Sequence, residues 1–200
     1  MPENRWVKPI VLEGDGIRME PLVIGHAAGL AAIAEPDLFR YFAGFRPEGR
    51  DVEAGEAFVR SVLGQPNKVA FAVVDRATTQ VIGSTSFMDI RSESRGLEIG
   101  STWIATPVQG TAVNPEAKLL MLTHAFDQLG AIRVQFRTDA RNLRSQRAIE
   151  KLGAKRDGIF RHDTIMPDGY LRDSVFYSIL AEEWPAVRDS LVSRLGGEVA

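Results

Sequence analysis

Residues 99–153 constrain the fold of this chain more than any other part of the sequence. An apolar run at 99–104 leads into a loop at 106–114, and a helical pattern follows at 115–129. A loop that opens a helix directs free backbone N–H groups and the positive helix end toward one place, which suits a phosphate or pyrophosphate group. A second helix, expected at 142–152, starts beside the next strand. This arrangement predicts a cofactor cleft.

The rest of the chain alternates strand and helix patterns without a linker or an internal repeat. Period-two patterns and turn signals predict strands at 10–12, 17–22, 69–75, 81–90, 97–104, 133–138, 154–162 and 172–180. Apolar stripes and capping signals predict helices at 25–34, 51–63, 115–129, 142–152 and 181–195. Residues 1–9 are expected to be a loose leader. The order predicts one mixed α+β domain over residues 1–200.

Composition excludes several classes of function. The chain has 200 residues and a formal net charge of −2, which argues against a general nucleic-acid binder. It contains no cysteine, so disulfides, thiolate nucleophiles and thiolate metal sites are excluded. Its three histidines have no metal-ligand spacing, and no metal is expected. No segment has the length of a membrane span or a signal-peptide core, so a cytoplasmic protein is expected.

Several short motifs follow one another between residues 96 and 184. They are Leu97-Glu98-Ile99-Gly100 with Trp103; Gln109-Gly110-Thr111 with Asn114; Arg133-Val134; Asn142 and Ser145 with Ala148-Ile149; Lys151-Leu152-Gly153-Ala154; Asp157-Gly158 with Arg161; Asp168-Gly169 with Arg172-Asp173; Tyr177-Ser178-Ile179-Leu180; and Glu183-Trp184. In order and spacing they resemble the GNAT superfamily of acetyl-CoA-dependent N-acetyltransferases. They are most similar to the branch with the ribosomal-protein N-terminal alanine and serine acetyltransferases.

The resemblance implies both a fold and a reaction. The fold is a mixed, mostly antiparallel sheet of about seven strands flanked by helices. It splays between the family's fourth and fifth strands, here 97–104 and 133–138. The reaction moves an acetyl group from the cosubstrate acetyl-CoA to a primary amine by direct attack in a ternary complex. The amine is a protein N-terminus or a small molecule, and the sequence leaves both open.

The resemblance also implies how CoA is held. It places the pyrophosphate on backbone N–H groups of Gln109, Gly110, Thr111, Ala112 and Val113. It places the pantetheine arm along Trp103, Ile104 and Ala105, as an added strand. The family commonly has a basic residue and a second glycine where this chain has Gln109 and Ala112. Two outcomes stay open: CoA binding is weaker, or it is shared with Arg141, Arg144 or Arg147.

Three polar residues are candidates for the chemistry. Asn142 matches the family's side-chain contact to the pantetheine arm, or it is only a helix N-cap, or both. Ser145 matches a position near the CoA sulfur, where it would aid the leaving thiolate, or it is a capping partner. Glu98 is the candidate general base, because partial burial would raise its pKa. The alternative for Glu98 is a solvated charge or a pair with an arginine such as Arg133.

The acceptor side is the least defined by the sequence. An aromatic group could wall it or pack in the core: Phe39, Tyr41, Phe42 and Phe45. Nearby acidic residues form either a solvated face or a surface that draws a cationic acceptor: Glu35, Asp37, Glu48, Asp51, Glu53 and Glu56. As an alternative function, the chain is a non-catalytic acyl-CoA sensor on the same scaffold. Whether it forms a homodimer also stays open.

Overall fold

The protein is built on one eight-stranded sheet. The structure, a computed structural model, describes residues 6–197. The strand order is β1-β2-β3-β4-β5-β6-β8-β7. The strands are β1 (Leu12–Glu13), β2 (Ile17–Pro21), β3 (Val69–Asp75), β4 (Val81–Arg91), β5 (Gly96–Ile104), β6 (Arg133–Asp139), β7 (Lys155–Ile165) and β8 (Leu171–Leu180). Among the described residues the β5–β6 pair alone is parallel, so the predicted mostly antiparallel sheet is confirmed, with eight strands.

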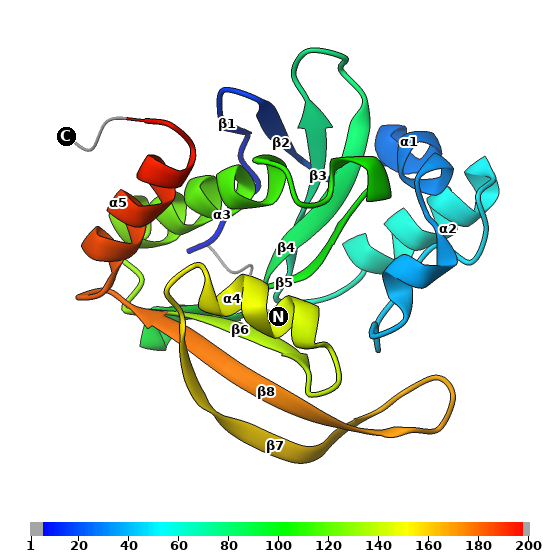
Figure 1. The fold of residues 1–200 in the computed structure, drawn as a ribbon. Helices are drawn as coiled ribbons and strands as arrows, with labels where there is room; N and C mark the ends of the chain where they lie inside the picture. The colour runs from blue at the N-terminus through cyan, green and yellow to red at the C-terminus, as the bar shows by residue number, and fades with distance from the viewer. Residues whose placement is uncertain (1–5, 198–200) are drawn as a thin grey trace.

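Five α-helices flank the sheet (Figure 1). They are α1 (Ala27–Ala32), α2 (Val52–Leu63), α3 (Val113–Thr123), α4 (Leu143–Glu150) and α5 (Trp184–Arg194). In Figure 1, α3 and α4 cross in front of the sheet, α1 and α2 lie to the right, and the β7–β8 hairpin runs along the bottom. Within the described part of the chain, no helix is long and apolar enough to cross a membrane.

The two faces of the sheet bury separate cores, as the alternation of β3 shows. Phe71 and Val73 point into the larger core, which α3, α4 and α5 cover. Ala70 and Ala72 point to the opposite face and pack with α1 and α2. The small side chains of β3 on that face let the two helices approach the sheet closely. The second core covers only the N-terminal half of the sheet, so the opposite face of β6 and β8 is left without a helix.

A buried carboxylate ties the start of α3 to the predicted turn at Gly14–Gly16. Glu116, in the first turn of α3, accepts a hydrogen bond from the Gly16 backbone N–H at 2.9 Å. A Cβ atom on Gly14 would lie 2.2 Å from Glu116 Oε1, so a larger residue there would push this flexible carboxylate aside. An acidic residue is also favourable at the positive end of a helix. The turn and the helix start therefore fix each other.

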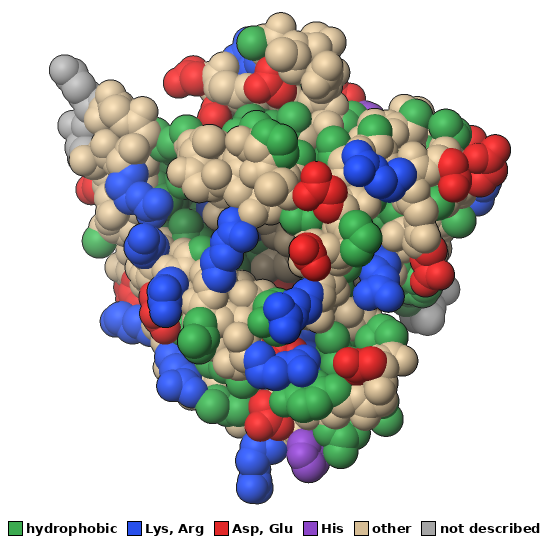
Figure 2. Space-filling view, turned by 45° about the vertical axis from the view of Figure 1, so that its right-hand side comes forward, with side chains coloured by type: hydrophobic (Ala, Val, Ile, Leu, Met, Phe, Trp, Pro, Cys, Tyr) green, Lys and Arg blue, Asp and Glu red, His purple; other side chains and the backbone are tan. Residues whose placement is uncertain are grey.

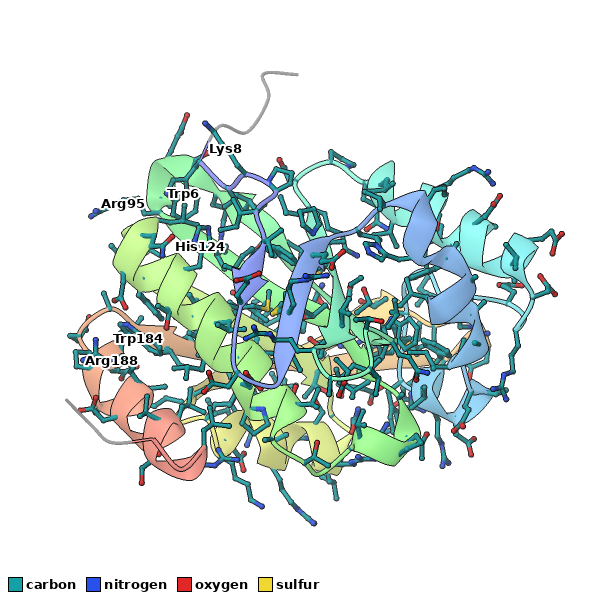
Figure 3. All side chains as sticks on the ribbon, turned by 90° about the horizontal axis from the view of Figure 1, so that it is seen from above. Trp6, Lys8, Arg95, His124, Trp184 and Arg188 are labelled. Atoms are coloured by element: carbon teal, nitrogen blue, oxygen red, sulfur yellow. The ribbon has the colours of Figure 1, made fainter. Side chains whose placement is uncertain are left out.

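The prediction of a loose leader is wrong for its described residues Trp6 and Val7. Val7 is only 3% exposed and belongs to the larger core. Trp6 donates a hydrogen bond from Nε1 to the Leu129 carbonyl at 2.9 Å and lies at the same end of the helix as His124 (Figure 3). Burial of these apolar groups explains why the segment packs. Residues 1–5 of the predicted leader lie outside the described residues.

Most predicted boundaries agree with the structure within a few residues, but the helix expected at 115–129 does not stay regular. It begins at Val113, and from His124 to Gln128 it widens into a π-helical turn. The Leu129 N–H bonds to the His124 carbonyl, five residues back, at 3.0 Å. The wider turn keeps three consecutive residues, His124, Ala125 and Phe126, in the interior.

Candidate active site

A splay between β5 and β6 opens the middle of the sheet. The two strands pair only at Gly96–Arg133, Leu97–Val134 and Glu98–Gln135. Beyond that point Ser101 adopts a left-handed backbone conformation (φ 49°), and the register with β4 shifts beside it. Such a bulge bends a strand and increases its twist. The predicted splay is confirmed, and the second half of β5 keeps one edge free.

The main chain of β5 presents only part of the predicted pantetheine segment to this opening. The Ala105 N–H donates to the Ile82 carbonyl at 2.8 Å, so it faces β4. Trp103 is also paired with β4 through Ser84. The Ile104 carbonyl points the other way and accepts a hydrogen bond from Gln109 Nε2 at 2.8 Å. Of the three residues, Ile104 is therefore the one whose main chain faces the splay.

The loop after β5 leaves several backbone donors unused. A short 3-10 helix, Thr106–Val108, leads into it, and Gly110 has a φ of 79° with open space where a Cβ would lie. No side chain caps the N-terminus of α3. The backbone N–H groups of Gly110, Thr111 and Ala112 have no hydrogen-bond partner among residues 6–197. The Val113 N–H makes one long bond of 3.4 Å to Thr111 Oγ1. These donors and the helix end suit an anion.

An arginine from α4 reaches this loop. Arg144 Nη2 donates to Gln109 Oε1 at 2.5 Å, so the glutamine bridges β5 and α4. Arg141 has other partners. It forms an ion pair with Asp139 at 2.8 Å, and its guanidinium lies 3.5 Å from the centroid of the Tyr170 ring. Arg147 is exposed. Of the three arginines considered from the sequence, Arg144 is the one with a contact to the loop.

The face that comes forward in Figure 2 is hollowed near its centre, and many Lys and Arg side chains gather to the left of the hollow and below it. The overall charge is −2, so this positive region is local. It would attract an anionic ligand more strongly than the net charge suggests.

Asn142 is the N-cap of α4, which is one of the two roles predicted for it from the sequence. Its Oδ1 accepts a hydrogen bond from the Ser145 backbone N–H at 3.0 Å. The amide nitrogen Nδ2 of Asn142 and the hydroxyl of Ser145 have no hydrogen-bond partner in the described part of the chain. Ser145 is half-buried. The cap fixes both residues at the start of α4 while leaving these two polar groups available.

Glu98 lies on the face of β5 opposite the larger core, as strand alternation predicts, and it is 3% exposed. Its Oε2 accepts a hydrogen bond from Gln135 Nε2 at 2.9 Å, and Arg137 Nε lies 3.6 Å from Oε1. Burial raises the pKa of Glu98, and the positive charge of Arg137 opposes that rise. Of the alternatives, the solvated charge is wrong, and the pair with an arginine is found with Arg137, while Arg133 pairs with Asp157 at 2.7 Å.

A small pocket of about 10 Å³ lies between α2 and strands β4 and β5, and its lining does not include Glu98. Its lining combines aromatic, hydroxyl and amine groups: Phe42, Phe45, Phe58, Val62, Lys68, Ser84, Ser86, Ser101 and Trp103. Lys68 Nζ donates to Ser101 Oγ at 3.1 Å. Burial lowers the pKa of Lys68 to about 8, and the charge of Glu98 acts in the opposite direction. Phe42 and Phe45 thus wall a pocket, whereas Phe39 packs in the core.

Four cationic side chains around the splay had no role predicted from the sequence: Lys68, Lys118, Arg137 and Arg172. Arg172 nevertheless belongs to one of the sequence motifs. Arg137 had a usable signal, because it alternates with Val134 and Phe136 and so shares a face with Gln135. The lysines and Arg172 had none, since long cationic side chains are normally exposed. Of the two interpretations of the acidic residues, attraction of a cationic acceptor has no support at this pocket, whose one charged lining residue among those described is Lys68.

The histidines do not form a catalytic group. His124 is buried and binds Gln128 through Nδ1 at 2.9 Å, while its Nε2 has no partner among the described residues. Its position within an apolar helix favours a structural role, in keeping with its burial. His162 is exposed on a bulge of β7, and His26 contacts Glu20 at 3.1 Å. No group of three or more His, Cys, Asp or Glu side chains within 6–197 could hold a metal ion.

Comparison with known proteins agrees with this geometry. The family model "Acetyltransferase (GNAT) domain" matches residues 17–155. YnaD of Bacillus subtilis (strain 168), an uncharacterized N-acetyltransferase, is 31% identical over 141 residues, which are 69% of this chain and 79% of YnaD. YdaF of the same organism, a candidate ribosomal N-acetyltransferase, is 31% identical over 102 residues, which are 51% of this chain. The match spans 55% of YdaF.

Solved structures show the same fold. A candidate acetyltransferase from T. thermophilus is 40% identical, with a TM-score of 0.88 over 95% of this chain and 99% of that one. RimJ of Mycobacterium smegmatis in complex with CoA-disulfide has a TM-score of 0.74 at 18% identity, over 95% of this chain and 94% of RimJ. The second likeness shows the fold alone.

Proposed function

The chain belongs to the GNAT acetyltransferase family, and on that premise we propose that it transfers an acetyl group from acetyl-CoA to a primary amine. The open donors of the loop before α3 and the splay between β5 and β6 carry the proposal together. A splay alone would suit many ligands, and a helix N-terminus alone would suit any anion. The hydrogen bond between Gln109 of the loop and Ile104 of β5 places the two features next to each other. Together they suit one long ligand with an anionic end.

The cosubstrate would be held by backbone groups in the main. The N–H groups of Gly110, Thr111 and Ala112 are free to bind the pyrophosphate, and Arg144 supplies the charge that Gln109 lacks. The edge of β5 that faces the splay at Ile104 would pair with the pantetheine arm, which would join or replace Gln109 Nε2 at the Ile104 carbonyl. RimJ of M. smegmatis, with the same fold, is known in complex with CoA-disulfide, which supports a CoA-type cosubstrate for this fold. When bound, acetyl-CoA supplies an activated acetyl thioester.

Glu98 is the proposed general base. An amine attacks a thioester only after it loses its proton, and a carboxylate with a raised pKa accepts that proton more readily near neutral pH. Glu98 lies where the splay starts, beside Gln135 and close to the acceptor-side pocket. We propose that it takes the proton directly or through a water molecule.

Ser145 and Asn142 are proposed to act at the thioester end. The free hydroxyl of Ser145 would donate a hydrogen bond to the leaving sulfur, and Asn142 Nδ2 would donate to the pantetheine arm. The chain has no cysteine, so direct attack in a ternary complex is proposed. The single-domain organisation, the homodimer and the cytoplasmic location remain predictions.

Calorimetric titration with acetyl-CoA tests the cosubstrate site. Saturable binding of acetyl-CoA and of free CoA, with no binding of ATP, supports the proposal. An amine-acceptor screen with the same preparation then distinguishes an enzyme from an acyl-CoA sensor. Only an enzyme releases the CoA thiol from acetyl-CoA faster than the reaction without protein does. Absence of binding by both CoA species would show that the family fold has lost its cosubstrate here.

A further inference from the structure

Arg172 on β8 is a buried cation without a counter-ion. Its side chain is 9% exposed, and within 6–197 it has no ion pair within 4.0 Å and no hydrogen bond. Its Nε atom is shielded from water and unpaired, and so is the hydroxyl of Ser174, two residues further on the same face of the strand. Buried donors without acceptors are rare and costly. Two of them side by side indicate a ligand.

The carboxylates near Arg172 already have other partners. Asp139 accepts two hydrogen bonds from the Arg141 side chain, at 2.8 and 3.0 Å. Asp163 lies 3.4 Å from Arg137, and Glu98 is bound by Gln135 and Arg137. Arg172 therefore interacts with these acids only at longer range. Its guanidinium keeps its planar set of donors for an acceptor from outside the chain.

The position of Arg172 joins it to the site. Val175, Tyr177 and Ile179 of β8 point into the larger core, so Arg172 and Ser174 point to the opposite face, where Glu98 and Arg137 lie. The electrostatic influence of Arg172 reaches both Glu98 and Arg137. A molecule that brought an amine to Glu98 would thus bring its neighbouring atoms toward Arg172.

Resting on the proposed function, we propose that Arg172 and Ser174 bind a carboxylate of the acceptor, so that the acceptors are amines that carry a carboxylate close to the amine. A guanidinium binds a carboxylate through two parallel hydrogen bonds, and the Ser174 hydroxyl adds a third donor. Lys68, on the other side of Glu98, disfavours polycationic acceptors. The carboxylate comes either from a free amino acid or from an acidic side chain beside a peptide N-terminus.

Matched acceptor pairs test the proposal and separate its two sources. The first arm compares phenylalanine with phenylalaninamide, which present the same amine with and without a carboxylate. The second arm compares a tripeptide amide that begins with Asp with one that begins with Asn. Rates are expressed per unprotonated amine, because the members of a pair differ in amine pKa. In one of the two arms, the acceptor with the carboxylate is expected to have a kcat/KM at least 10-fold higher than its amide. That arm shows whether the carboxylate comes from a free amino acid or from an acidic side chain of a peptide.

Variants assign the preference to Arg172. Arg172→Met is expected to remove it through a KM for the acid raised 10- to 100-fold, whereas Arg172→Lys, which keeps the charge, retains part of it. Arg156→Met is the matched control, because Arg156 is an exposed arginine on the neighbouring strand and faces the other side of the sheet, toward Tyr177. It is expected to keep the full preference.

Two outcomes overturn the inference in different ways. Acetylation of amines with equal kcat/KM in both arms overturns the carboxylate site and leaves the acetyltransferase intact. Failure to bind acetyl-CoA overturns the proposed function and the site together. A preference that survives in Arg172→Met with its KM unchanged also contradicts the assignment. The acetyl-CoA affinity of each variant shows whether it is folded.

Discussion

At the scale of single residues, Glu98 and Lys118 are both buried, but they have different polar neighbours. Glu98 keeps Gln135 and Arg137 beside it. Lys118 Nζ donates to Thr102 Oγ1 at 2.9 Å, and within 6–197 no carboxylate lies within ion-pair distance. Burial raises the pKa of the carboxyl group and lowers that of the amine to about 7. The two groups therefore give opposite dependences of stability on pH.

Glu98→Gln is expected to lower kcat/KM by about 10²- to 10³-fold, because the amide cannot accept the proton of the acceptor amine. In the wild type, kcat/KM should rise with pH as Glu98 ionises, with a midpoint above the ordinary value of 4.5. The variant should lose that limb of the profile while binding acetyl-CoA normally. Glu93→Gln, at an exposed carboxylate just before β5, is the control. An unchanged profile in Glu98→Gln contradicts the assignment.

The same substitution bears on stability. The folded state holds the Glu98 proton more tightly than the unfolded state, so this contribution to stability is complete below pH 4.5 and is lost as pH rises through the raised folded pKa. Glu98→Gln should therefore be at least as stable as the wild type at neutral pH, although it is less active. Urea denaturation at pH 5 and pH 8 measures the difference.

Lys118→Met is expected to stabilise the protein at pH 7 by on the order of a few kcal/mol, since methionine fills the space without a charge to desolvate. The lowered folded pKa makes wild-type stability complete above pH 10.5 and lost as pH falls toward about 7. The variant should lack this dependence between pH 7 and 10. Lys8→Met, at an exposed site, should retain it. Lower stability of Lys118→Met at pH 7 would show that the amine is favourable where it lies.

At the scale of elements, the loop before α3 depends on one backbone conformation. Gly110→Ala is expected to weaken acetyl-CoA binding about 10-fold, because alanine disfavours a φ of 79° by about 1 kcal/mol or more and the loop must relax away from the ligand. Calorimetry measures the change. Gly196→Ala is the matched control. Gly196 has a φ of 81° and equally open surroundings, but it lies after the end of α5. Equal affinities in the two variants would show that the loop donors do not bind the ligand.

Periodicity and caps predict the elements well because both are local. Asn142 caps α4 and Asp51 caps α2, as their residue types favour. The bulge at Ser101 has no such signal, since serine does not favour a left-handed conformation and the bulge depends on pairing with β4. The alternation of β5 places Glu98 on the correct face. Which arginine lies beside Glu98, Arg133 or Arg137, depends on strand register, which the sequence does not specify.

At the scale of the whole molecule, Trp103 connects the active site to the smaller core. Its ring makes edge contacts with Phe39 and Phe58, at centroid distances of 5.2 and 6.0 Å. Trp103→Ala is expected to cost about 3–5 kcal/mol of folding free energy and to loosen α1 and α2 selectively. Hydrogen exchange should show faster exchange in these helices and little change in α5. Uniform acceleration would indicate that the two cores unfold as one unit.

The hydrogen bond between Trp6 and Leu129 has a consequence for biosynthesis. It joins positions 123 residues apart, and the Gly16–Glu116 contact joins positions 100 apart. A ribosome makes the N-terminal member of each pair many seconds before its partner, at about 5–20 residues per second. The first strands must therefore wait, with apolar side chains such as Val7 uncovered, until α3 has emerged. Slowed translation across residues 7–116 would lengthen the interval in which the nascent chain needs a chaperone.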